Sequence, residues 1–227
     1  MKKILNLLTF VLMSIVSGLL FSQVTGVNPF IMVAGVMSLG FLPQPQGVLM
    51  FNWASLTWGD GVKNMGGLKT IGYFASVAEI DNFPELPTNP ASTVEEVTLE
   101  SVTGFTMLLA NTFHELYSTM ETSEVVDEPQ GETDGMSFIH KATIFHPGTS
   151  VDAMAFAAQV NNAGMVFIFE EASGGARRVI GSKAFPAKCK VAVTTGKATA
   201  DRKGITIEIM SYGYTPAPFY TGAIPLV

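Results

Sequence analysis

The three histidines of the chain are the first residues to consider for metal or acid–base chemistry. His140 and His146 are six residues apart, so on one continuous strand their side chains would share a face. A protein zinc site needs a third side-chain ligand, and none stands at a suitable spacing. Pro147 further indicates that the strand ends there, and His114 beside Glu115 has no better partner. We therefore expect ordinary histidines and no metal site.

Clustered acids offer a second kind of chemistry. Four acids could collect a calcium ion, but their spacing does not match the EF-hand loop, so solvated carboxylates are expected. These four are Asp127, Glu128, Glu132 and Asp134. The neighbouring pairs Glu95-Glu96 and Glu170-Glu171 would point to opposite faces of a strand, which does not suit an acid/base pair.

The single cysteine, Cys189, could be a nucleophile only beside a base in an electropositive pocket. Its neighbours Lys188 and Lys190 would point to the opposite face of a strand, so a small buried thiol is expected. The sequence has no phosphate-binding loop and no Gly-x-Ser-x-Gly motif. We expect no catalytic residue, no cofactor and no enzymatic activity.

Charge is scarce and unevenly distributed. Only 14% of the residues are charged, and the net charge is -6. No Lys or Arg occurs from Thr70 to His140, whereas that stretch holds 13 Asp and Glu. Residues 141–227 hold nine basic and five acidic residues. Three interpretations stay open: a solvated acidic face, an acidic patch that meets a basic patch of another copy, and an acidic wall past which DNA slides. No basic stripe that would grip phosphates is visible.

The N-terminus is apolar after Lys2-Lys3. Two uncharged runs, 4–21 and 30–42, are separated by a break, and Ser22-Gln23 ends the first run in the manner of a secretory signal. The second run is short for a membrane span. Three interpretations stay open: a cleaved signal peptide, a retained helical arm used in assembly, and a membrane anchor through residues 4–42.

From residue 70 onward most short runs favour strands. Residues 94–100 predict a strand, and the unbroken apolar run 165–170 predicts a strand covered on both faces. The acidic stretch 121–135 predicts a long exposed loop or a wide hairpin. The aromatic and proline-rich residues 212–222 predict an extended segment laid on a surface.

One helix is well signalled. Pro147-Gly148 stops the preceding strand, and Thr149 or Ser150 can cap residues 151–160. The sequence thus predicts a mainly β fold: a β-sandwich or barrel with one short packed α-helix over about 150–161. The predicted segments are an apolar, helical arm or signal-like segment over 1–43, a linker or docking segment over 44–69 and the β-sandwich domain over 70–227.

The order of these features over residues 70–227 resembles the major tail-tube proteins of tailed phages, especially phages that infect Bacteroidetes. The acidic stretch 121–135 matches the long inter-strand loop of that family, 145–148 leads into the helix, and 215–222 closes the chain. The resemblance implies a virion protein whose subunits form hexameric rings that stack into a tube. An acidic lumen would let DNA pass during ejection without specific binding, and other virion proteins would be partners.

We expect acidic and basic residues to meet between copies, together with aromatic residues near the C-terminus. The expected inter-subunit residues are Glu121, Glu124, Asp127, Glu128, Glu132, Asp134, Arg177, Arg178, Phe219 and Tyr220. Arg177-Arg178 taken alone indicates a solvated hairpin.

Two alternatives to the tube stay open. The apolar arm departs from ordinary tube subunits, so the chain could be another virion protein, capsid-associated or part of a connector. It could also be an exported β-sandwich binding protein in the periplasm or at the cell surface, with its signal peptide cleaved.

Overall fold

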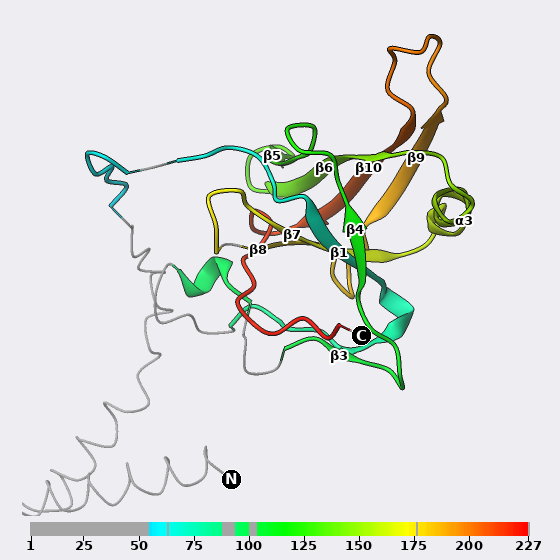
Figure 1. The fold of residues 1–227 in the computed structure, drawn as a ribbon. Coiled ribbons are helices and arrows are strands. Elements are labelled where there is room, and N and C mark those ends of the chain that lie inside the picture. The colour runs from blue at the N-terminus through cyan, green and yellow to red at the C-terminus, as the bar shows by residue number, and fades with distance from the viewer. Residues whose placement is uncertain (1–54, 63, 88–93, 100–103, 176, 227) are drawn as a thin grey trace, which may run out of the picture. The chain divides into compact units, whose positions relative to one another are not determined.

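The computed structural model describes residues 55–62, 64–87, 94–99, 104–175 and 177–226. Two four-stranded antiparallel sheets form a β-sandwich, and a small two-stranded sheet stands beside them (Figure 1). The predicted mainly β fold with one short helix is confirmed. The predicted arm over 1–43 lies outside the described residues. No helix of the described residues is long and apolar enough to cross a membrane.

The inner sheet has the strand order β4-β1-β7-β8. Its strands are β4 (His114–Tyr117), β1 (Ile71–Ser76), β7 (Met165–Glu170) and β8 (Arg177–Ile180). The outer sheet has the order β5-β6-β10-β9. Its strands are β5 (Glu124–Gln130), β6 (Ser137–Pro147), β10 (Gly204–Gly213) and β9 (Lys188–Thr194). The small sheet pairs β2 (Ile80–Asn82) with β3 (Thr106–Met107).

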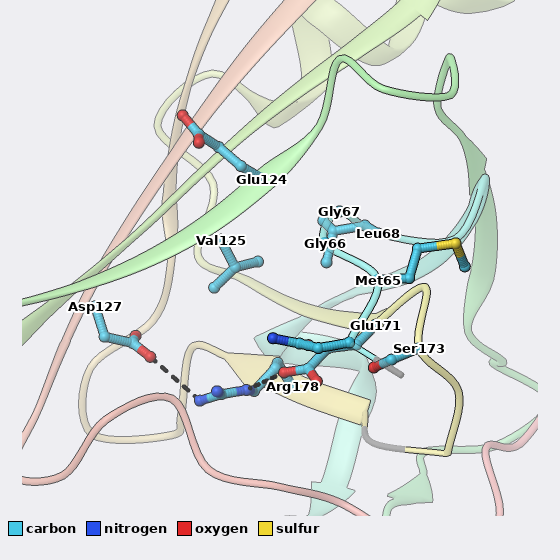
Figure 2. A pocket seen from close by; sticks show the side chains of 11 residues that line it. Met65, Gly66, Gly67, Leu68, Glu124, Val125, Asp127, Glu171, Ser173 and Arg178 are labelled. Atoms are coloured by element: carbon cyan, nitrogen blue, oxygen red, sulfur yellow. Dashed lines mark hydrogen bonds and ion pairs between the residues drawn. The ribbon is translucent and has the colours of Figure 1, made fainter. Parts of the chain in front are cut away.

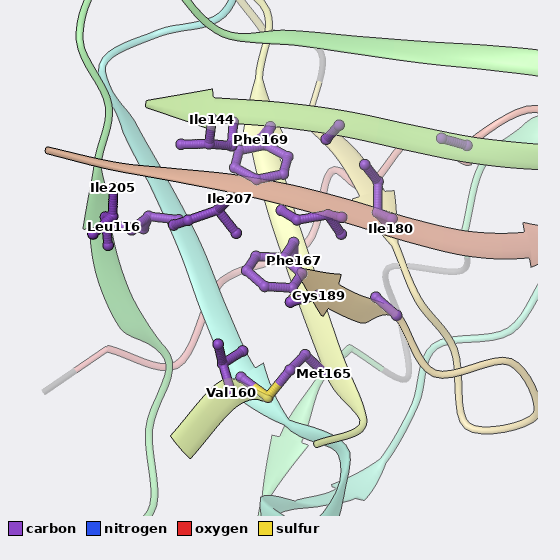
Figure 3. Close-up of a cluster of buried hydrophobic side chains, with 14 of the residues drawn as sticks. Leu116, Ile144, Val160, Met165, Phe167, Phe169, Ile180, Cys189, Ile205 and Ile207 are labelled. Carbon is purple, nitrogen blue, oxygen red and sulfur yellow. The ribbon is translucent and has the colours of Figure 1, made fainter. Parts of the chain in front are cut away.

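The main core fills the space between the two sheets (Figure 3). Phe167 and Phe169 of β7 stack with centroids 5.9 Å apart and belong to the same cluster as Ile207 of β10. The opposite face of β7 carries Val166 and Ile168, which belong to a second buried cluster. Five consecutive residues of β7 are therefore buried, as the unbroken apolar run predicted. Each such fully buried side chain stabilises the fold by roughly 1.5–3 kcal/mol.

The second cluster is completed by the C-terminal segment, residues 214–226. The Val179 N–H donates to the Pro218 carbonyl at 3.0 Å, and the Tyr220 N–H donates to the Arg177 carbonyl at 2.9 Å. These bonds lay the segment along the free edge of β8. The Tyr220 ring is 0% exposed and packs edge-on against Phe105, 5.1 Å away. Of the predicted extended segment 212–222, residues 212–213 instead belong to β10 and 214–217 are bends, whereas residues 218–220 run along β8.

The predicted helix is α3 (Val151–Val160). The Ser150 hydroxyl accepts a hydrogen bond from the Ala153 N–H at 3.2 Å and so caps its first turn. Ala153 and Val160 are buried, and Phe156 packs edge-on against Phe74 of β1, with centroids 5.0 Å apart. Ala153, Phe156, Ala157 and Val160 recur at helical spacing, and they are the residues of α3 that are buried or half-buried.

The strand predicted over residues 94–100 is wrong in its described part. Glu95–Val97 forms a 3-10 helix, η2, and the Thr98 hydroxyl donates to the Val94 carbonyl at 2.6 Å to close the turn. No strand pairs with this segment along its whole length, so the strand propensity of its β-branched residues does not determine its conformation. Glu95 and Glu96 consequently do not alternate across a sheet. A second 3-10 helix, η1 (Val77–Glu79), follows β1.

The acidic stretch 121–135 was predicted to form either a long loop or a wide hairpin, and it forms a hairpin. β5 pairs with β6 from Glu124↔Thr143 to Gln130↔Ser137, which leaves residues 131–136 as the turn. β6 ends at Pro147, where the proline predicted that the strand stops. At the other end of the domain, the Lys69 N–H donates to the Glu170 carbonyl at 2.8 Å. The last residues of the predicted linker thus already join the inner sheet.

Candidate functional site

A network of charged side chains joins the two sheets (Figure 2). Asp127 of β5 lies at its centre. One carboxylate oxygen is 2.7 Å from Nδ1 of His140, and the other is 3.3 Å from Nη1 of Arg178. The Arg178 Nε donates in turn to Oε1 of Glu171 at 2.9 Å. A carboxylate can only accept, so Nδ1 of His140 carries the proton in this pair.

Arg178 also secures the C-terminal segment. Its Nη1 donates to the Ala217 carbonyl at 3.0 Å, and its guanidinium lies 4.3 Å from the centre of the Phe219 ring. The planar guanidinium suits this combination of forked hydrogen bonds and ring stacking. Arg178 is therefore not the solvated hairpin residue that was predicted, because its contacts are satisfied within the chain. Arg177 is similar, since its Nη1 donates to the Gly222 carbonyl at 2.8 Å.

The electrostatics of Asp127 reflect a balance between burial and partners. Burial alone would raise the pKa of this carboxyl, but the hydrogen bonds of His140 and of the Ala217 backbone and the charge of Arg178 outweigh burial. The net result is a pKa below the ordinary value of 3.8. Asp127 is therefore ionised at neutral pH.

An Asp–His pair can serve catalysis when the other imidazole nitrogen faces a substrate. His140 is only 3% exposed, and its Nε2 lies against the Gly213 backbone, where an added Cβ would come within 2.5 Å of it. A general base must come within hydrogen-bond reach of its substrate proton, and this closed environment leaves no such approach. The pair accordingly holds β5 against β6 and orients Asp127 toward Arg178.

A cavity of about 350 Å³ opens beside the network, between β5 and residues 64–68. Its polar lining includes the carboxylates of Glu124, Asp127 and Glu171 and the guanidinium of Arg178. Three anionic groups and one cationic group favour a positively charged ligand over an anionic one. Within the described residues no group of three or more His, Cys, Asp or Glu side chains is close enough to hold a metal ion.

A second hollow, of about 430 Å³, lies between α3 and strand β1. Phe74, Phe156 and Met165 form its apolar part, and His114 stands at its rim with its ring 5.4 Å from that of Phe74. The three histidines are thus dispersed. His146 is occupied elsewhere, where its Nδ1 lies 2.9 Å from the Tyr117 carbonyl oxygen.

The buried thiol expected at Cys189 is confirmed. Cys189 lies in the main core, and burial raises its pKa to about 12, against a smaller opposing effect of Lys188. A thiol that remains protonated at neutral pH is a poor nucleophile.

The ten expected inter-subunit residues fall into two groups. Five acids are exposed along the β5–β6 hairpin or just before it: Glu121, Glu124, Glu128, Glu132 and Asp134. The other five make contacts inside the chain: Asp127, Arg177, Arg178, Phe219 and Tyr220. Tyr220 has no exposed surface with which to reach another copy. For the exposed acids the inter-subunit role stays a prediction.

The pairing of Asp127 with His140 was missed from the sequence. The signal was present in the hairpin register, because a turn centred between Thr133 and Asp134 places residue 127 directly opposite residue 140. An acid and a histidine opposite each other on the inward face of a hairpin are natural partners.

Comparison with known proteins adds no relative to this picture. No family model matches the chain, and neither a curated protein nor a solved structure matches it.

Proposed function

We propose that this chain is a non-enzymatic structural subunit that works by self-association, and specifically a subunit of a phage tail tube. The observation that carries the proposal is a run of apolar side chains presented to solvent on the segment that precedes β1. Four of them are more than half exposed: Leu56, Trp58, Val62 and Met65.

In an isolated molecule this segment leaves large apolar side chains in contact with water, which is unfavourable. Leu56 is 99% exposed and Trp58 is 68% exposed. Each Leu, Val or Met side chain that moves from water into an apolar contact stabilises the contact by roughly 1.5–3 kcal/mol. Exposed apolar patches often mark sites at which another molecule binds. A second copy of the chain is available as a partner wherever the chain is made.

Scarce charge supports the same proposal. Charged residues make up 14% of the chain, whereas about a quarter is usual in soluble domains. A surface with few charges is better suited to contact with other subunits than to full solvation.

Two features support the tube in particular. The β-sandwich with a single packed helix is the architecture that the resemblance implies. Two exposed acids, Glu124 and Glu128, lie on the edge strand β5, which carries no Lys or Arg. In a ring of subunits such an edge would repel phosphates and let DNA pass without being held. Stacked rings and virion partners belong to the proposal on the same grounds.

The test is the state of association of the purified full chain, by light scattering over a dilution series and by negative-stain electron microscopy. We expect rings or tubes that persist on dilution. Replacing Leu56 and Trp58 together with Ser should reduce the assembled fraction, whereas Thr57→Asn, on the same exposed segment, should leave it unchanged. A wild-type chain that stays monomeric at high concentration would contradict the proposal.

A further inference from the structure

The outer sheet ends in two hairpin turns of opposite charge. The acidic hairpin, residues 124–136, exposes Glu124, Glu128, Glu132 and Asp134 and contains no Lys or Arg. The basic hairpin, residues 188–204, exposes Lys188, Lys190, Lys197, Arg202 and Lys203, and Asp201 is its single acid.

The strand register places these turns far apart. β10 pairs with β6 from Gly204↔Pro147 to Gly213↔Phe138, so the basic turn lies at the Pro147 end of β6. The acidic turn follows Gln130↔Ser137 and lies at the opposite end. β6 has 11 residues, so at about 3.3 Å per residue the two ends are roughly 33 Å apart.

The two hairpins also lie at opposite edges of the sheet, because β5 and β9 are its two edge strands. The acidic and basic turns therefore stand at diagonally opposite corners and cannot reach each other within one copy. The basic turn projects beyond the body of the sandwich (Figure 1, orange).

The basic turn is shaped to present its cations. The Asp201 carboxylate accepts the backbone N–H groups of Lys197 and Ala198, at 2.8 and 2.9 Å. These bonds fold the turn back on itself and turn the single acid toward its own backbone. Arg202 lies 5.7 Å from the centre of the Phe145 ring, and Lys197, Arg202 and Lys203 are all exposed.

The acidic turn carries two exposed carboxylates besides Glu128. Glu128 is already paired with Lys141 across the hairpin. Glu132 and Asp134 are exposed at the turn itself, with Asp134 at φ 69° and Gly131 at φ 99° fixing its shape.

We propose that the acidic hairpin of one copy binds the basic hairpin of the next, so that copies associate head to tail. The inference rests on the proposed function and names the surfaces that self-association uses. Charge complementarity sets the register and the choice of partner. A contact between two different patches of the same chain is heterologous, and it generates a ring if the rotation closes and a filament if it does not.

Charge reversal tests the pairing. Lys203→Glu and Glu132→Lys should each weaken association, by about tenfold in dissociation constant, because an attraction becomes a repulsion at an exposed contact. Lys183→Glu and Glu96→Lys change the net charge equally at exposed positions outside both hairpins, and they should associate as the wild type does.

Rescue provides the decisive arm. A mixture of Lys203→Glu and Glu132→Lys chains should reassemble, since each reversed hairpin then finds its complement on the other variant. The double variant Lys203→Glu/Glu132→Lys should associate by itself for the same reason. Circular dichroism of each variant confirms that the fold is intact.

The outcomes separate the two proposals. If the wild type is monomeric, the proposed function fails. If the wild type assembles but the reversed variants assemble equally well, or if mixing them restores nothing, the head-to-tail pairing is wrong while self-association stands.

Discussion

The substitution Asp127→Asn tests whether the charged network stabilises the sandwich. The Asp127 side chain is 15% exposed and accepts hydrogen bonds from two side-chain donors, His140 and Arg178. An asparagine side chain has one acceptor oxygen, so its amide N–H₂ must face one of the two donors.

The magnitude follows from that mismatch. A buried donor left without an acceptor costs about 1–3 kcal/mol, and the lost charge-assisted bond to Arg178 adds to this cost. Because Arg178 keeps Glu171 and the Ala217 carbonyl, the total should stay near the lower range for a broken buried pair, at about 2–4 kcal/mol.

Urea unfolding at pH 7 measures the effect. Glu128→Gln is the matched control, since Glu128 is the next residue of β5, is exposed, and pairs with Lys141 on the surface. An exposed pair of this kind contributes about 0.2–1 kcal/mol. Equal losses for the two variants would refute the buried-network argument.

The pH dependence provides an independent check. The pKa of Asp127 is lower in the folded chain than its ordinary value of 3.8, so the carboxylate contributes its full stability above about pH 5 and loses it as the pH falls through the folded-state pKa. The difference in the free energy of unfolding between wild type and Asp127→Asn should therefore shrink as the pH falls below about 5, because the carboxyl takes up its proton there. A difference that is constant over that range would show that the charge of Asp127 is irrelevant.

Three further predictions concern the packing around this network and the core. Cys189, with a pKa of about 12, should react with a thiol reagent at pH 8 only as fast as the chain unfolds, so that urea accelerates the reaction. Gly213→Ala should cost about 1–3 kcal/mol in chemical denaturation, because the new methyl would overlap the His140 ring, whereas Gly135→Ala, with room around it, should cost less than about 1 kcal/mol. Tyr220→Phe should lower the free energy of unfolding by about 1–2 kcal/mol through the loss of its hydroxyl hydrogen bonds; an unchanged thermal midpoint would contradict their role.

Elements that depend on local signals could be predicted from the sequence. α3 was identified because Ser150 caps it and because its apolar residues recur at helical spacing. β7 was identified as doubly covered because its apolar run has no polar interruption. In both cases the residues themselves carry the information that decides the structure.

Features that depend on register or on distant partners could not be predicted. Residues 94–97 have strand propensity but no complete neighbouring strand, so η2 formed instead. Arg178 looked like a surface residue because its partners come from β5, from the turn after β7 and from the C-terminal segment. No spacing within the sequence brings those three parts together, since only the folded sandwich does.

The position of the C-terminal segment has a consequence for biosynthesis. Tyr220 fills the outer side of the inner sheet, and the Phe113 N–H donates to the carbonyl of Pro225. During translation the strands of that sheet are made before residues 214–226, so the second buried cluster lacks Tyr220 until this segment has been synthesised. Nascent chains that stall or are truncated before residue 217 would expose part of the apolar face of this sheet. Chaperones and proteases recognise such surfaces.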